Sequence, residues 1–121
     1  MRLKNKIVLV TASTRGIGLA CVKACAAINY LTKLIAVQEA SNHIRCNAIL
    51  PGMIKTDRWE KNPDFYRDVP SRFTPIGDVA VGEDVADAVY YFAAHARNTT
   101  GAELIVDGGN TIQLYPIIPK S

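Results

Sequence analysis

The feature that most constrains the fold is a short apolar run, followed by a loop of small residues and then by a long segment without Gly or Pro. Residues 7–10 are continuously apolar and rich in β-branched side chains, which is typical of a strand buried on both faces. Residues 11–18 are mostly small, and residues 19–40 contain neither Gly nor Pro. Apolar side chains recur there at helical spacing, at Ala24, Ala27, Ile28, Leu31 and Ile35. The start of the chain therefore predicts a strand, a tight loop and a helix.

The rest of the chain continues this alternation. Residues 44–50 predict a second strand, which Pro51-Gly52 ends abruptly. Residues 53–78 carry three prolines and predict a long loop, with a short helix around residues 64–68. A second helix is predicted from about residue 83 to residue 96, and a third strand over residues 103–106. This order predicts a single α/β domain over residues 1–121, with about three parallel strands and flanking helices.

Composition excludes several classes of protein. The chain of 121 residues is 49% hydrophobic with a net charge of +3, which suits one folded domain. It has no run of like charges that would bind nucleic acid, and no apolar stretch of the ~18–20 residues that a membrane span needs. The basic N-terminus precedes an apolar run that polar residues interrupt, which favours a cytoplasmic protein over a signal peptide. The three cysteines form no disulfide framework, and with His43 they match no zinc spacing, so reduced cysteines are the simpler interpretation.

The small-residue loop has the context of a dinucleotide-binding site, since it follows a strand and opens a helix. Gly16 would let the backbone approach a pyrophosphate, and Gly18 would let the helix pack close to the strand. The helix N-terminus would offer free N–H groups to the phosphates. Ala12 stands where a first glycine is expected, and no acidic residue is well placed for a ribose. An ordinary strand-to-helix turn is therefore the alternative.

Three segments together resemble one family. Residues 11–18 (Thr-Ala-Ser-Thr-Arg-Gly-Ile-Gly) resemble the T-G-x-x-x-G-I-G cofactor loop of the classical short-chain dehydrogenases/reductases, and residues 44–57 and 100–109 resemble that family's sixth and seventh strands. The amino-acid sequence of these segments is most similar to that of bacterial 7α-hydroxysteroid dehydrogenases, which act on bile acids. The resemblance implies a truncated Rossmann-like fold, an NAD(P)-dependent oxidoreductase of the hydroxysteroid or alcohol class, a small alcohol or ketone such as a steroid or bile acid as substrate, and possible homo-oligomers.

The resemblance also implies which residues would bind the cofactor. Pro51 and Gly52 would face the nicotinamide, the Ile54 backbone would meet its carboxamide, and Thr56 would lie near the phosphates. Arg15 would favour NADP over NAD by binding the 2′-phosphate, although a solvated Arg at a helix start is an equal alternative. Residues 57–75 would cover the substrate, with Trp59, Phe65 and Tyr66 either contacting it or forming a packing cluster. The full cofactor-binding set is Thr11, Ser13, Arg15, Gly16, Ile17, Gly18, Pro51, Gly52, Ile54 and Thr56.

The catalytic residues that the resemblance implies are missing. The family uses a Tyr, a Lys four residues later and a Ser, but no Tyr in this chain is followed by Lys at that spacing. Cys21 and Cys25 stand at the Tyr and Lys positions, while Tyr30 and Lys33 are three apart. We therefore predict an internal deletion joined near residues 25–27, no catalytic residues, and an inactive isolated chain. The alternatives are a remnant that binds nucleotide weakly without catalysis, or a non-functional product. The deletion should also strain the fold by exposing faces of buried type, and by making the first helix overhang or break near the join.

Overall fold

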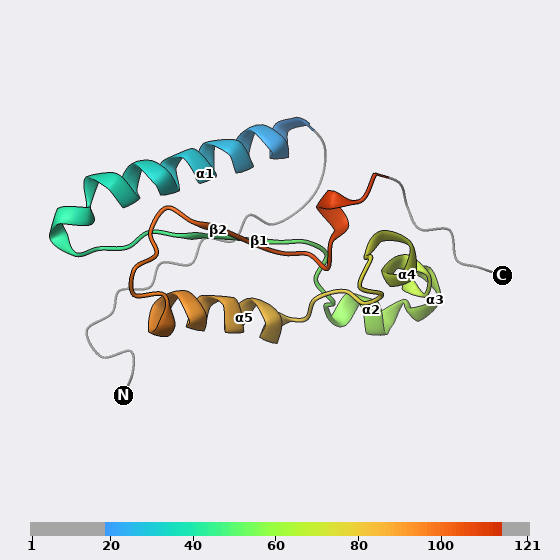
Figure 1. Ribbon diagram of the computed structural model, residues 1–121. Coiled ribbons are helices and arrows are strands. Elements are labelled where there is room, and N and C mark those ends of the chain that lie inside the picture. The colour runs from blue at the N-terminus through green and yellow to red at the C-terminus, as the bar shows by residue number, and fades with distance from the viewer. Residues whose placement is uncertain (1–18, 115–121) are drawn as a thin grey trace. The chain divides into compact units, whose positions relative to one another are not determined.

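The computed structural model describes the backbone of residues 19–114 and the side chains of residues 27–114. The chain forms two compact units and passes from one to the other at three points, after Ala48, after Val89 and after Leu104. Two strands, β1 and β2, pair in the same direction, and the predicted strand at residues 7–10 lies outside the described part. The described elements, shown in Figure 1, are α1 (Leu19–Gln38), η1 (Ala40–Asn42), β1 (Ala48–Pro51), α2 (Asp57–Lys61), α3 (Pro63–Tyr66), α4 (Val69–Phe73), α5 (Gly82–Tyr90), η2 (Tyr91–His95), β2 (Glu103–Val106) and η3 (Asn110–Ile112).

Helix α1 confirms the predicted helix and continues without a break through the expected join at residues 25–27. Among its described side chains, residues 27–38, Thr32 and Ala36 are buried, whereas Leu31 is about half exposed. The Thr32 hydroxyl donates to the Ile28 carbonyl at 2.9 Å, which satisfies a buried polar group one turn back in the helix. The apolar spacing thus located the helix but not its buried side.

Strand β1 is shorter than the sequence predicts, because it begins at Ala48 rather than at residue 44. Side chains replace the regular ladder just before it. The Cys46 N–H donates to the Thr100 hydroxyl at 3.1 Å, and the Asn47 carboxamide accepts from the Ala102 N–H at 3.0 Å and donates to the Thr99 carbonyl at 3.1 Å. One backbone bond also lies there, from the Gly101 N–H to the Cys46 carbonyl at 2.7 Å, and the regular ladder begins where the Ala48 N–H donates to the Ala102 carbonyl at 2.9 Å. A side chain that satisfies backbone groups in this way removes the need for strand geometry.

The predicted loop at residues 53–78 contains three short helices. The short helix predicted around residues 64–68 overlaps α3, whereas α2 and α4 were not predicted. Helix α3 begins at Pro63, and Pro70 lies in the first turn of α4. At those positions the missing N–H of proline has no helical partner to lose, so proline starts a helix instead of preventing one. Pro63 and Pro70 were therefore misread as loop residues, whereas Pro75 lies outside any helix. After these helices the chain returns to the beginning of this segment, where an isolated parallel bridge joins Ile54 to Ala80.

The last predicted helix is confirmed, but its end is wider than an α-helix. Helix α5 passes directly into the π-helical turn η2, where the Ala96 N–H donates to the Tyr91 carbonyl at 3.0 Å. Strand β2 has the predicted bounds. None of the described helices combines the length and the apolarity that a membrane crossing requires.

Small side chains make up the core of both units. Among the described side chains, the buried apolar ones are Ala36, Ala48, Val79, Ala88 and Ala96. Larger apolar residues that usually fill a domain core are exposed instead, including Tyr30 at 71% and Val37 at 78% on α1. Among its described residues, α1 thus carries exposed apolar side chains, while the deletion itself stays a prediction.

Candidate functional site

The candidate site lies where β1 and β2 end, because ligands of parallel α/β sheets bind at the carboxyl ends of the strands. Gly52 follows β1 directly, and its N–H donates to the Val106 carbonyl at 2.9 Å. A Cβ on Gly52 would lie 2.6 Å from the Asp107 Cβ, which is closer than real carbon atoms approach. Glycine at this position therefore allows the two strand ends to lie against each other.

The turn after β2 is built by Asp107. Its carboxylate accepts the Gly109 N–H at 2.8 Å, the Thr111 N–H at 2.8 Å and the Thr111 hydroxyl at 2.7 Å. Burial alone raises the pKa of the Asp107 carboxyl, but these hydrogen bonds outweigh burial and hold the pKa below its ordinary value of 3.8. The carboxylate is thus used to shape the turn.

The same turn is fastened to the segment that follows α4. The Phe73 carbonyl accepts the side-chain amides of Asn110 at 2.7 Å and Gln113 at 2.8 Å. The Ile76 N–H donates to the Gly108 carbonyl at 3.1 Å. These long-range contacts carry no sequence motif that would have revealed them, because each joins residues more than thirty positions apart.

Ile54 and Thr56, the other predicted cofactor residues after β1, lie on the short path from β1 to α2. The Ile54 side chain is half-buried, and the next residue, Lys55, donates its N–H to the Ala80 carbonyl at 2.8 Å. Thr56 is the N-cap residue of α2 and is exposed, and its carbonyl accepts the Trp59 N–H at 2.8 Å. The structure thus brings Pro51, Gly52, Ile54 and Thr56 together on one continuous segment at the strand end.

The other half of the predicted cofactor site lies outside the described residues. This half is the small-residue loop, with Thr11, Ser13, Arg15, Gly16, Ile17 and Gly18. Their roles toward a pyrophosphate or a 2′-phosphate therefore stay predictions.

A cavity of about 290 Å³ opens beside the short helices of the second unit. The Trp59 and Tyr66 rings line it and stack at 4.5 Å between centroids with 18° between their planes. Lys55, Arg67 and Asp78 also line it, so its wall is both aromatic and charged. Phe65 meets Tyr66 edge-on but is 78% exposed. Two of the three predicted substrate-loop aromatics thus share a cavity, and they also form the predicted packing cluster. No local sequence pattern predicts the charged side chains in this wall.

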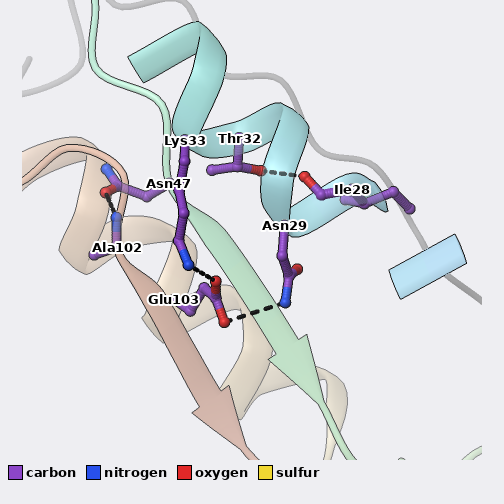
Figure 2. A network of polar contacts seen from close by, with 7 residues as sticks. All are labelled: Ile28, Asn29, Thr32, Lys33, Asn47, Ala102 and Glu103. Atoms are coloured by element: carbon purple, nitrogen blue, oxygen red, sulfur yellow. Dashed lines mark hydrogen bonds and ion pairs between the residues drawn. The ribbon is translucent and has the colours of Figure 1, made fainter. Parts of the chain in front are cut away.

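Lys33, which with Tyr30 comes nearest to the catalytic spacing, contacts the start of β2. Figure 2 shows Lys33 pointing to Glu103 at the start of β2, with 2.8 Å between Nζ and the carboxylate. The Asn29 amide donates to the other oxygen of the same carboxylate at 3.1 Å. Tyr30 is 71% exposed. Lys33 therefore serves to hold α1 against the start of β2.

Metal ligands are not gathered in the part of the molecule whose side chains are described, residues 27–114: no three His, Cys, Asp or Glu there could share an ion. Cys46 is a free, half-buried thiol. Cys21 and Cys25 lie on α1, outside the described side chains.

Comparison with known proteins agrees with this architecture. The family model described as enoyl-(acyl carrier protein) reductase matches residues 20–111. A 7alpha-hydroxysteroid dehydrogenase of Paraclostridium sordellii is 39% identical over 85 residues, which is 68% of this chain and 32% of that protein. The chain thus spans about a third of the length of the curated relatives it matches.

Solved structures give the same result. A short-chain dehydrogenase/reductase family oxidoreductase of Burkholderia thailandensis is similar at a TM-score of 0.67 with 31% identity, covering 78% of this chain and 39% of that one. A putative 2-deoxy-d-gluconate 3-dehydrogenase of Agrobacterium tumefaciens, solved with bound NADP, is similar at a TM-score of 0.65 with 35% identity, covering 78% of this chain and 39% of that one. The α/β architecture with parallel strands and flanking helices is therefore that of nucleotide-binding oxidoreductases. The chain belongs to the short-chain dehydrogenase/reductase family.

Proposed function

We propose that this chain is a non-catalytic descendant of an NADP-dependent hydroxysteroid or alcohol dehydrogenase, which keeps part of the cofactor site and transfers no hydride as an isolated chain. Oxidoreductase descent follows from the family to which it belongs. The observation that carries the rest of the proposal is the fate of its Tyr and Lys residues. No Tyr has a Lys four residues later, and Lys33, nearest to that spacing, is engaged with Glu103.

The missing pair matters because it would do the proton chemistry of the family. A Lys one helical turn after a Tyr shares its face, so its charge can lower the Tyr pKa. Loss of a general acid/base by itself lowers the rate by ~10²–10⁴-fold. In this chain Cys21 and Cys25 occupy the two positions, by resemblance to the family. Neither can repeat the Lys role, since a thiol carries no positive charge.

An internal deletion joined near residues 25–27 accounts for the loss. The family match begins at residue 20, within α1 and close to the proposed join. The small core and the exposed apolar residues of α1 support the same proposal, because they leave the helix without the neighbours that its sequence suits. The deletion would remove the second to fifth strands of the family fold together with the catalytic residues.

NADP is the proposed cofactor, with NAD as the alternative. The Agrobacterium structure holds NADP, and this chain keeps Pro51, Gly52, Ile54 and Thr56 on one segment at the end of β1. Arg15 would bind the 2′-phosphate. Substrates of the steroid or bile-acid class are proposed for the enzyme from which the chain descends, on the similarity to a 7alpha-hydroxysteroid dehydrogenase.

Thermal unfolding of the purified chain with and without NADPH tests the proposal. Ligand at one hundred times its dissociation constant should stabilise the fold by ~2.7 kcal/mol, and Arg15→Gln should reduce the shift more for NADPH than for NADH. A bile acid with NADP should give no turnover. An unshifted melt would instead support the non-functional product, and measurable turnover that survives repurification would overturn the inactive assignment.

A further inference from the structure

A second cavity, of about 620 Å³, lies in the first unit and shares no lining residue with the cofactor segment. Its wall comes from two segments of the first unit. One contains His43, Ile44 and Arg45, which precede β1, and the other runs from Arg97 to Thr100, which precedes β2. The volume falls in the range of ~300–1,000 Å³ that small-molecule sites occupy. The family's substrate and cofactor chemistry is placed at the carboxyl ends, so this cavity is not part of that site.

The charge of this cavity has one sign. Arg45, Arg97 and His43 line it, and no Asp or Glu is among its lining residues. Two guanidinium groups around one concave surface raise the local potential and attract anions, most strongly at low ionic strength.

The Arg45 side chain is joined to the other segment of the wall by one hydrogen bond. Its side chain is half-buried, and Nη1 donates to the Thr99 carbonyl at 3.5 Å. A guanidinium carries five N–H donors in a planar fork, so this one bond leaves most of the fork available. The Thr100 hydroxyl, on the same wall, accepts the Cys46 N–H at 3.1 Å, which fixes the two segments to each other. The wall is therefore ordered by contacts that do not consume its charge.

We propose that this cavity binds a phosphate-bearing small molecule, with Arg45 and Arg97 pairing with phosphate oxygens. The planar guanidinium fork matches phosphate oxygens in bidentate geometry, and such charge-assisted bonds are about twice as strong as neutral ones. The His43 imidazole is a third nitrogen-bearing side chain on the same wall. This inference does not depend on NADP binding at the carboxyl ends.

Inorganic pyrophosphate is the probe, titrated into the whole chain at low salt. Two readouts are recorded, calorimetric affinity and NMR shifts of backbone amides. We expect the largest shifts at Arg97 to Thr100. Arg45→Gln and Arg97→Gln should each weaken binding about tenfold or more. Arg58→Gln, on α2 in the other unit, is the matched control and should leave the affinity unchanged.

Each outcome decides the proposal. Pyrophosphate shifts confined to residues outside 40–45 and 93–100, or an unchanged affinity in Arg97→Gln, would overturn it. Citrate binding as tightly as pyrophosphate would overturn the phosphate assignment. If Arg45→Gln unfolds, Arg97→Gln and the shifts of the unaltered chain still decide. Arg15→Gln separates the two proposed sites, because it should reduce the NADPH effect and leave the pyrophosphate shifts at Thr99 and Thr100 in place.

Discussion

At the scale of single residues, two glycines show how backbone angle and available space act separately. Gly77 and Gly108 both have positive φ, at +93° and +61°. A Cβ on Gly77 would meet nothing within 4 Å, whereas one on Gly108 would lie 2.2 Å from the Thr74 Cγ2 and 2.8 Å from the Ile76 Cγ2. Thr74 is 1% exposed and cannot move into solvent. Glycine is thus required at position 108 for two reasons, the positive φ angle and the lack of space for a Cβ beside Thr74 and Ile76.

Gly108→Ala should therefore destabilise the chain by ~2–4 kcal/mol, since left-handed strain and overpacking add. Gly77→Ala, the matched control, should cost only ~1–2 kcal/mol, because it meets the strain alone. Urea unfolding followed by circular dichroism measures both. Equal losses in the two variants would show that the Thr74 contact does not limit this turn.

Asp107 should make the stability of the same turn depend on pH. Its folded pKa lies below the ordinary value of 3.8, so its contribution is present above the unfolded pKa and is lost as pH falls through the folded pKa. Urea unfolding of the natural chain and of Asp107→Asn should therefore differ most near neutral pH, and the difference should shrink as pH falls through the folded pKa of Asp107. A difference between the two chains that stays constant across the whole acid range would exclude the carboxylate charge as its cause.

At the scale of helices and strands, the spacing of apolar residues and the positions of Gly and Pro predicted the elements that depend on nearby residues. The Gly- and Pro-free segment became α1, and residues 103–106 became β2. Two predictions failed for identifiable reasons. Asn47 and Thr100 satisfy backbone groups before Ala48, which shortens β1, and two of the three prolines, Pro63 and Pro70, stand in the first turn of a helix. Both failures depend on which hydrogen-bond partner a backbone group has. Before β1 that partner is more than fifty residues away in the sequence.

The site follows the same rule. Pro51, Gly52, Ile54 and Thr56 could be placed together from the sequence because they are contiguous. The contact of Gly52 with Asp107 and the two basic segments of the second cavity join distant parts of the chain, so no local pattern could reveal them.

The link between α1 and β2 is a contact between elements whose strength can be measured. Lys33 is 59% exposed and Glu103 27%, so solvent and salt screen their ion pair. Glu103→Gln keeps an acceptor for the Asn29 amide and removes only the charge. A double-mutant cycle with Lys33→Met should give a coupling of ~0.5–1 kcal/mol at low salt that declines in 1 M NaCl. A coupling that salt does not reduce would mean that Lys33 contributes through packing.

At the scale of the whole molecule, the described side chains of residues 27–114 bury few large apolar groups. The buried apolar side chains of the described residues are four alanines and one valine, while Tyr30, Leu34 and Val37 of α1 are exposed. Leu, Ile and Phe normally fill such a core, and burying one completely contributes ~1.5–3 kcal/mol. Their exposure is expected if the segment that once packed on α1 has been deleted, and it favours association between chains.

Replacing the missing segment tests the deletion directly. A chimera would place the middle of a 7alpha-hydroxysteroid dehydrogenase relative between residues 25 and 26 of this chain, restoring the second to fifth strands and the Ser, Tyr and Lys. We expect a cooperative melt, an upward shift with NADPH and turnover of a bile acid with NADP, because the retained ends would again meet their partners. Replacing the restored Tyr by Phe should lower the rate by ~10²–10⁴-fold while leaving the NADPH shift intact. A chimera that folds and binds NADPH but is as inactive as its Tyr-to-Phe form would show that the retained ends have diverged from the enzyme, so that deletion alone does not explain the loss.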